Sequence, residues 1–126
     1  MKIDVVEVTT SDMKRTAAFY TLLGFGFPEF KENEDHLEPK ILDGSARLMI
    51  DSKKMMTEML GAAPKPGNHG SFAIQYDSPG EIDSVAKKVK EGGFKLVKEP
   101  WDAFWGQRYA VVQDPDGYQI DLYAQL

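Results

Sequence analysis

The chain contains no cysteine, which excludes disulfide bonds, thiolate nucleophiles and cysteine-based metal sites. It has no apolar run long enough to span a bilayer, and its first residues, Met1 to Asp4, lack the features of a secretory signal. These absences predict a cytoplasmic protein without a membrane partner.

Basic residues are outnumbered: 15 lysines and arginines face 20 acidic residues, for a net charge of −5. Such a chain lacks the electrostatic footprint of a nucleic-acid-binding protein. Apolar residues make up 42% and charged residues 28% of the sequence, which is ordinary for a globular protein. A length of 126 residues predicts a single domain, 1–126, with one main core.

The clearest local signal is a turn, Asp114-Pro115-Asp116-Gly117, between two β-rich segments. Its aspartates, proline and glycine each favour a tight turn, so residues 105–123 are predicted to form a β-hairpin. Side chains alternate along a strand. A second strand that buries Ile120 and Leu122 therefore directs Asp121 and Tyr123 to the opposite face.

The order of predicted elements occurs twice along the chain. In the first half, a strand predicted at 3–9 is followed by a helix that begins after Ser11-Asp12. Three more strands are predicted after this helix, at 25–30, 39–42 and 46–51. In the second half, a helix that starts at Ser78 and stops at Gly92-Gly93 separates strands at 71–76 and 94–98, and the hairpin supplies two more. This repetition predicts two βαβββ modules, residues 1–52 and 70–126, joined by a linker at 53–69 in which 55–60 is compatible with a short helix. The predicted fold is α+β, a curved mixed sheet with a concave cavity and with helices on the outer side.

The ordered set of motifs resembles a known superfamily. Ser11-Asp12, Ala18-Phe19-Tyr20, Leu23-Gly24-Phe25 and Asp114 to Tyr118 are similar to the pattern of the glyoxalase I/bleomycin resistance/extradiol dioxygenase superfamily, the vicinal oxygen chelate fold. The resemblance covers nearly the whole chain. It implies two modules that form a ligand cavity and, usually, a homodimer.

The resemblance also implies four metal-ligand positions, typically histidine and glutamate. The matching residues are Val5, Met49, Ser71 and Asp121, of which only Asp121 is a strong oxygen ligand. Because zinc and related divalent metals favour several imidazole or carboxylate donors, this set predicts a metal-free branch without a cofactor. The two histidines, His36 and His69, are interpreted as exposed loop residues. Whether His69 or Asp121 contributes to an atypical metal site stays open.

Small-molecule binding is the leading interpretation of the inferred inner face and of residues 100–105, an aromatic segment predicted to form a loop before a strand. The candidate ligand-binding residues are Val5, Glu7, Arg47, Met49, Ser71, Gln75, Trp101, Phe104, Trp105, Arg108, Asp121 and Tyr123. The aromatic residues would either wall a pocket or pack a dimer interface. Glu7 and Asp121 would either exchange protons, with Tyr123 as a third candidate, or pair with Arg47 or Arg108.

The leading functional hypothesis is a metal-independent protein that binds, and in one version sequesters, a drug or metabolite. A second hypothesis is a glyoxalase-like lyase, isomerase or dioxygenase, which would need a metal. A third is a metal-free enzyme that uses Glu7 or Asp121 as an acid or base.

Overall fold

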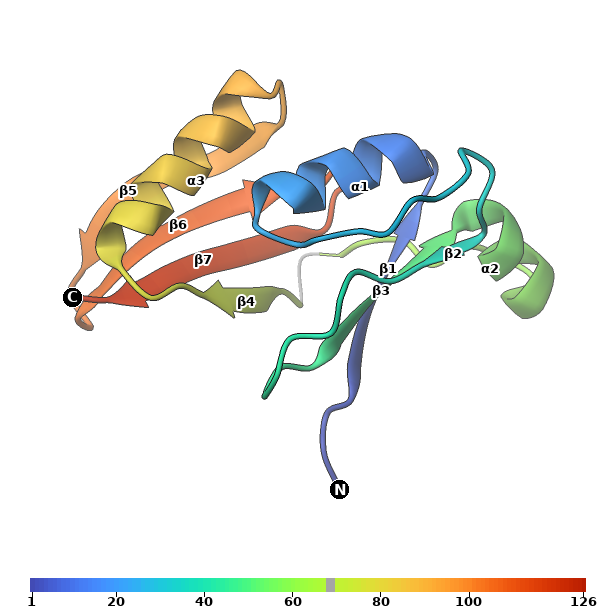
Figure 1. Ribbon diagram of the computed structural model, residues 1–126, viewed down its shortest axis with the longest axis horizontal. Helices are drawn as coiled ribbons and strands as arrows, with labels where there is room; N and C mark the ends of the chain where they lie inside the picture. Colours follow the sequence, from blue (N-terminus) through green and yellow to red (C-terminus); the bar gives the residue numbers. More distant parts are fainter. Residues whose placement is uncertain (68–69) are drawn as a thin grey trace. The chain divides into compact units, whose positions relative to one another are not determined.

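The computed structural model describes residues 1–67 and 70–126, and the chain divides into two compact units, Met1–Pro66 and Gly67–Leu126 (Figure 1). The described residues form three helices and two mixed sheets, of three and four strands. The predicted α+β class is therefore confirmed. None of the helices in these ranges has the length and apolarity needed to cross a membrane.

The first unit contains β1 (Val5–Thr10), α1 (Met13–Leu22), β2 (His36–Leu37), β3 (Arg47–Ser52) and α2 (Lys53–Leu60). Its sheet has the order β1-β3-β2, with β1 parallel and β2 antiparallel to β3. Side-chain caps begin both helices, because the Asp12 side chain accepts a hydrogen bond from the Arg15 amide and the Ser52 side chain accepts one from the Met55 amide. The helix start at Asp12 and the short helix within 55–60 are confirmed.

Two strands predicted in the first unit, 25–30 and 39–42, are absent from the structure. Segment 25–30 contains Pro28, which has no amide hydrogen to donate to a strand ladder. The two predicted strands share only an isolated backbone bond, from the Lys40 amide to the Gly26 carbonyl, 2.8 Å. The strand that does pair with β3 in this region is the two-residue β2, in which His36 lies opposite Asp51 and Leu37 opposite Ile50.

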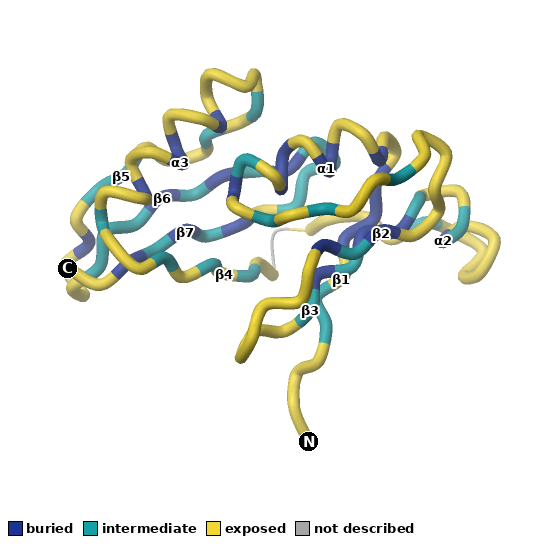
Figure 2. Tube along the Cα trace, viewed as in Figure 1, coloured by how far each residue is buried: buried dark blue, intermediate teal, exposed yellow. Residues whose placement is uncertain are grey.

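The second unit contains β4 (Phe72–Gln75), α3 (Pro79–Glu91), β5 (Lys95–Ala103), β6 (Gln107–Gln113) and β7 (Gln119–Gln125), with the strand order β4-β7-β6-β5. Helix α3 begins with the predicted capping box of Ser78 and Glu81. It packs along β5, β6 and β7 and covers one face of the sheet (Figure 1). The buried residues of α3 form a stripe along the helix (Figure 2); they are Ile82, Val85, Ala86 and Val89.

The predicted hairpin is confirmed as β6 and β7. One carboxylate oxygen accepts two backbone hydrogen bonds within the turn: Asp114 Oδ1 accepts from the Asp116 amide at 3.0 Å and from the Tyr118 amide at 2.9 Å. Gly117 has a backbone φ of +103°, a value that residues with a side chain rarely adopt. Ile120 and Leu122 are fully buried, whereas Asp121 and Tyr123 alternate with them on the other face and are half-buried.

One boundary in the second unit differs from the prediction. Residues 100–103 were predicted as a loop before a strand, but they belong to β5. The pairing of β5 with β6 shifts register between Leu96 and Lys98 and again between Lys98 and Trp101. Such irregularities let a proline occupy a strand. Regular pairing resumes after them, so that Trp101 lies opposite Tyr109.

Candidate functional site

The second sheet has an aromatic face on the side opposite α3, formed by Trp101, Trp105, Tyr109, Tyr123 and Asp121. Strand register creates it, because Tyr109 of β6 lies between Trp101 of β5 and Tyr123 of β7. The Tyr109 ring centroid is 5.3 Å from that of Trp101, 5.4 Å from that of Trp105 and 6.2 Å from that of Tyr123. The Tyr109–Tyr123 pair is stacked and the Trp105–Tyr109 pair is edge-on, both favourable geometries.

Asp121 is the charged group within this aromatic face. The Tyr109 hydroxyl donates to Asp121 Oδ2 at 2.9 Å. Burial, followed by this bond and the charge of Asp121, raises the pKa of Tyr109 to about 12. The residue opposite Asp121 on β4 is Ala73, whose short side chain leaves the carboxylate half-buried rather than covered.

The rim of the aromatic face carries polar and cationic groups. The Trp105 indole donates to Gln107 Oε1 at 2.9 Å, and the Tyr123 hydroxyl donates to Gln75 Oε1 at 3.4 Å. The Lys98 ammonium lies 3.8 Å from the centroid of a Trp101 ring. A cation at this distance from an indole ring is in a favourable cation–π geometry.

Tyr109 is a site residue that the sequence analysis missed. The signal was present in the hairpin register, since a turn that pairs Gln113 with Gln119 also pairs Tyr109 with Tyr123. Phe104, by contrast, was predicted to bind ligand, and it is 98% exposed at the β5–β6 turn with its ring 5.0 Å from that of Trp105.

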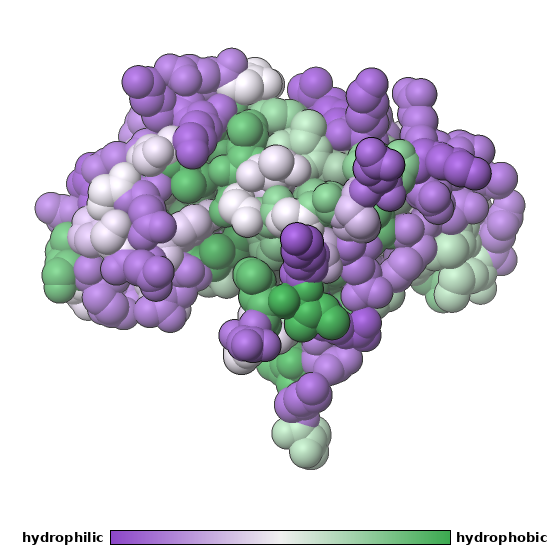
Figure 3. All heavy atoms as spheres, in the orientation of Figure 1, coloured by the Kyte–Doolittle hydropathy of each residue, from purple (hydrophilic) through white to green (hydrophobic). Residues whose placement is uncertain are grey.

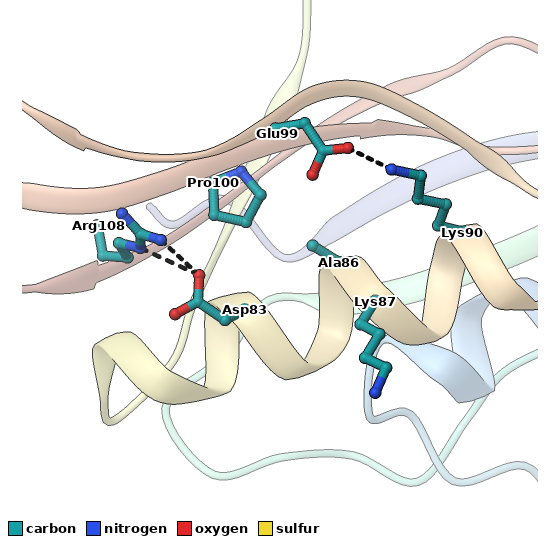
Figure 4. A pocket seen from close by; sticks show the side chains of 7 residues that line it. All are labelled: Asp83, Ala86, Lys87, Lys90, Glu99, Pro100 and Arg108. Atoms are coloured by element: carbon teal, nitrogen blue, oxygen red, sulfur yellow. Dashed lines mark hydrogen bonds and ion pairs between the residues drawn. The ribbon is translucent and has the colours of Figure 1, made fainter.

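Arg108 lies on the face that α3 covers (Figure 4). Its guanidinium donates to Asp83 of α3 through Nη2 at 2.7 Å and Nε at 3.1 Å, and to Asp102 through Nη1 at 3.1 Å. These two carboxylates raise the pKa of Arg108. The alternative that Arg108 pairs with Asp121 is therefore wrong, because alternation along β6 turns Arg108 away from Tyr109 and Asp121.

A shallow pocket of about 340 Å³ adjoins Arg108 between α3 and β5. Its walls include Asp83, Lys90, Glu99 and Pro100 (Figure 4). Lys90 Nζ lies 2.6 Å from Glu99 Oε1, so the charges of this pocket largely satisfy one another. It is a less suitable ligand site than the aromatic face.

The first sheet has a polar face formed by the alternate residues Glu7, Thr9, Arg47 and Asp51, with Val5 and Met49 among them. The opposite face buries Val8, Leu48 and Ile50. Arg47 donates to Glu38 Oε1 at 2.9 Å and to Asp4 Oδ2 at 3.2 Å. Within this unit, Arg47 therefore pairs with Glu38 and Asp4 in place of the expected Glu7.

His36 was interpreted as an exposed loop histidine. It is exposed, as predicted, but it belongs to a strand: it lies on β2 with Nδ1 2.6 Å from Asp51 Oδ1 and Nε2 3.0 Å from Glu38 Oε2. The hydrogen bond with Asp51, and then that with Glu38, raise the pKa of His36. Partial desolvation and the nearby charge of Asp51 likewise raise the pKa of Glu7.

A protein-family model for the glyoxalase/bleomycin resistance protein/dioxygenase superfamily matches residues 2–122. The chain belongs to this superfamily. A curated relative, the glyoxalase domain-containing protein RDO1 of Mycosarcoma maydis, is 28% identical over 95% of this chain, which spans 66% of the length of that relative.

Solved structures support the same fold for this superfamily member. A glyoxalase-related enzyme from Fulvimarina pelagi matches with a TM-score of 0.82 at 17% identity, over 98% of this chain and 88% of that one. A lactoylglutathione lyase from Agrobacterium tumefaciens matches with a TM-score of 0.69 at 16% identity, over 98% of this chain and 92% of that one. At these identities the likeness concerns the fold alone.

The metal-ligand positions that the superfamily resemblance implies do not form a suitable donor set in this chain. Val5 and Met49 lie on the polar face of the first sheet, Ser71 precedes β4, and Asp121 is bonded to Tyr109. An apolar side chain, a thioether and a hydroxyl are poor donors beside one carboxylate. In the ranges that the structure describes, no three histidine, aspartate or glutamate side chains form a group able to hold a metal. His69 lies outside the described residues.

Proposed function

We propose that this superfamily member binds a small, planar organic cation on the aromatic face of its second sheet, without a metal. The observation that carries the proposal is Asp121, a half-buried carboxylate that is oriented by Tyr109 within a set of four aromatic rings. An aromatic surface with a single oriented anion favours a flat ligand that bears a positive charge.

Hydrogen bonding makes this carboxylate a defined anchor. The Tyr109 hydroxyl bonds to one oxygen of Asp121, and the residue opposite Asp121 on β4 is the small Ala73. The rings supply apolar contact area, and Gln75 and Gln107 add polar groups at the edges. Trp101, Trp105, Asp121, Tyr123 and Gln75 are thus the predicted ligand residues that this proposal retains.

The other predicted ligand residues have different places in the proposal. Ser71 and Phe104 lie at the margins of the second unit, while Val5, Glu7, Arg47 and Met49 belong to the first unit. Their contribution to the same ligand stays a prediction. Phe104 also suits the alternative role in a homodimer, since its ring is almost fully exposed.

A matched pair of probes tests the proposal: N-methylquinolinium, which is planar and cationic, and naphthalene, which has a similar shape without the charge. Both tryptophans of the chain lie on the aromatic face, so their fluorescence reports binding there. We expect the cation to bind more tightly than the neutral probe. Failure of both probes to bind, or equal affinity for the two, would contradict the proposal.

Three variants locate the binding surface. Trp101→Ala should weaken binding of both probes, because it removes stacking area, whereas Asp121→Asn should remove only the preference for the cation. Arg108→Gln is the control, because Arg108 lies on the face covered by α3 and bonds to Asp83. An Arg108→Gln variant that loses binding as Trp101→Ala does would show that the wrong face has been chosen.

Metal independence is tested on purified protein by elemental analysis. We expect no metal in a stoichiometric amount after incubation with zinc, nickel, manganese or iron and removal of the excess. Stoichiometric metal that disappears in Asp121→Asn would refute the metal-free part of the proposal and would favour a glyoxalase-like or dioxygenase activity.

A second function, metal-free acid–base catalysis, is favoured by one observation in the first unit. Glu7 is an exposed carboxyl group whose pKa is raised by partial desolvation and by Asp51. A carboxyl group with a raised pKa suits proton transfer near neutral pH. An activity retained in Glu7→Gln and lost in Asp121→Asn would argue against Glu7.

A further inference from the structure

Three titratable side chains from three strands meet on the polar face of the first sheet: Glu7 of β1, Asp51 of β3 and His36 of β2. We propose that they form one acid–base site in which the buried Asp51 is the shared hydrogen-bond acceptor and the exposed Glu7 is the group open to a bound molecule. The proposal rests on the second function above. It adds Asp51, which the sequence analysis did not name, and gives His36, interpreted there as an exposed loop residue, the role of a positioning residue.

The strand register builds this site. Glu7 lies opposite Met49 on β3, so Asp51 is the next residue along β3 on the same face. His36 lies directly opposite Asp51 across the antiparallel β2–β3 pair. Asp51 is therefore the central group, with one neighbour on each adjoining strand.

Burial gives the three groups different roles. The Asp51 side chain is 3% exposed, and its Oδ1 lies 2.6 Å from His36 Nδ1. A carboxylate so removed from water needs hydrogen-bonded partners, and a charge-assisted bond from the imidazole supplies one. Glu7 is exposed and is the member of the pair of carboxyl groups that a ligand can reach.

The hydroxyl of Thr9 provides an independent sign of a polar site. Thr9 is 6% exposed, lies opposite Asp51 in the β1–β3 register, and shares the face of Glu7. Within the described part of the chain, its Oγ1 atom has no hydrogen-bond partner. A buried hydroxyl of this kind is costly unless a further polar atom meets it.

The remaining charged groups near the site act from the exposed side of His36. Glu38 Oε2 lies 3.0 Å from His36 Nε2, and its other oxygen accepts from Arg47, which also bonds Asp4. Glu38 thus supports the charge of His36 but is not among the groups that shift the pKa of Glu7. This difference separates the site from a general acidic surface.

The chemistry of the three groups defines the ligand class. Protonated Glu7 donates a hydrogen bond, and deprotonated Glu7 accepts a proton, while the Thr9 hydroxyl can do either. These groups suit a small uncharged molecule with a carbonyl or amide oxygen. When the ligand releases a proton to Glu7 and later recovers it, the reaction involves no net change in protons, electrons or charge.

Side-chain NMR titration of the whole protein tests the shared acceptor. The chain has two histidines, so His36→Gln identifies the imidazole signal of His36 by its disappearance. In the native protein we expect pKa values for Glu7 and His36 above their ordinary values of 4.5 and 6.5. Asp51→Asn should lower both, whereas the control Glu38→Gln should lower that of His36 alone.

Two results would overturn the inference: an Asp51→Asn protein in which only one of the two pKa values moves, or a Glu38→Gln protein in which both fall together. If Asp51→Asn does not fold, His36→Gln gives a separate test that leaves the buried carboxylate in place. Because the charge of His36 lowers the pKa of Glu7, His36→Gln should raise it further, and an unchanged or lower value contradicts the site.

Acetamide serves as the amide probe for the ligand class, with the methyl signal of Thr9 as the reporter. We expect acetamide to shift that signal more at a pH where Glu7 is protonated than at a pH where it is not. An equal shift at both pH values would refute the role of Glu7 as the donor. These measurements follow protons in the first unit, so failure of ligand binding on the aromatic face would not be mistaken for failure here.

Discussion

Replacement of Asp114 by alanine should destabilise the second unit strongly, although the residue is one of four in a surface turn. Asp114 is 4% exposed, and its Oδ1 accepts hydrogen bonds from the Asp116 and Tyr118 amides at 3.0 and 2.9 Å. The Asp114 amide in turn donates to the Tyr118 carbonyl at 2.8 Å, which closes the β6–β7 hairpin. The side chain therefore holds the turn that sets the register of the two central strands.

The expected loss follows from these two bonds. A hydrogen bond to a charged group contributes about 1.5–3 kcal/mol, so removal of two gives an upper limit of about 6 kcal/mol. The freed amides of a turn can reach water after a small movement, which returns part of that loss. We therefore expect Asp114→Ala to lower the free energy of unfolding by about 2–4 kcal/mol. Asp114→Asn keeps an oxygen acceptor without the charge and should lose about half as much.

Urea unfolding followed by tryptophan fluorescence measures this loss, because both tryptophans lie in the second unit. The slope of the transition should stay the same while its midpoint falls. A loss below about 0.5 kcal/mol in Asp114→Ala would refute the reasoning, because it would be no larger than that of an ordinary surface substitution. Equal losses in the alanine and asparagine variants would show that the oxygen acceptor is not the source of the stability.

Three further predictions follow from the two units. In absorbance titration, Tyr109→Phe should remove an ionisation near pH 12, and Asp121→Asn should lower the pKa of Tyr109; a Tyr109 that titrates near pH 10 in the native protein would contradict the bond to Asp121. Ile120→Ala should cost about 3 kcal/mol in urea unfolding, because the residue is fully buried against the core beneath α3, and a loss below about 1 kcal/mol would contradict that packing. The raised pKa values of Glu7 and His36 favour the folded state at low pH: the contribution of Glu7 should be complete below pH 4.5 and decline as the pH rises above that value, and the contribution of His36 should be complete below pH 6.5 and decline above it; thermal unfolding that is insensitive to Glu7→Gln and His36→Gln across this range would contradict it.

The sequence predicted the parts of the fold that depend on local chemistry. Caps at Asp12 and Ser78 and the turn at residues 114–117 each involve hydrogen bonds within a few residues, so they can be recognised without knowledge of the tertiary fold. The alternation of β7 was equally accessible, because it needs only one buried face. These signals were sufficient for the α+β class and for the position of Asp121.

The features that the sequence did not predict depend on partners far along the chain. Strand β2 exists because His36 and Leu37 meet β3, 15 residues away at Asp51, whereas the more strand-like segment 25–30 forms one backbone bond with Lys40 but is not assigned as a strand. β-Propensity describes how well a residue suits a pleated surface, and it cannot supply the neighbouring strand. For the same reason the sequence did not reveal that Asp51 and His36 join Glu7 in one cluster, since neither Asp51 nor His36 belongs to a local motif.

The surroundings of Asp121 change the meaning of its place in the superfamily pattern. A half-buried carboxylate without imidazole co-ligands would lower the stability of the strand unless a hydrogen-bond donor satisfied it. Tyr109 is that donor, and it lies opposite Tyr123 because the turn that positions Asp121 also sets the β6–β7 register, while the β5–β6 pairing places Trp101 on its other side. The two tyrosine rings and the charge therefore arise from one structural cause, the β6–β7 hairpin. A change that shifts the hairpin by one residue would turn Tyr109 and Asp121 to opposite faces, and it should abolish ligand binding even where the unit remains folded.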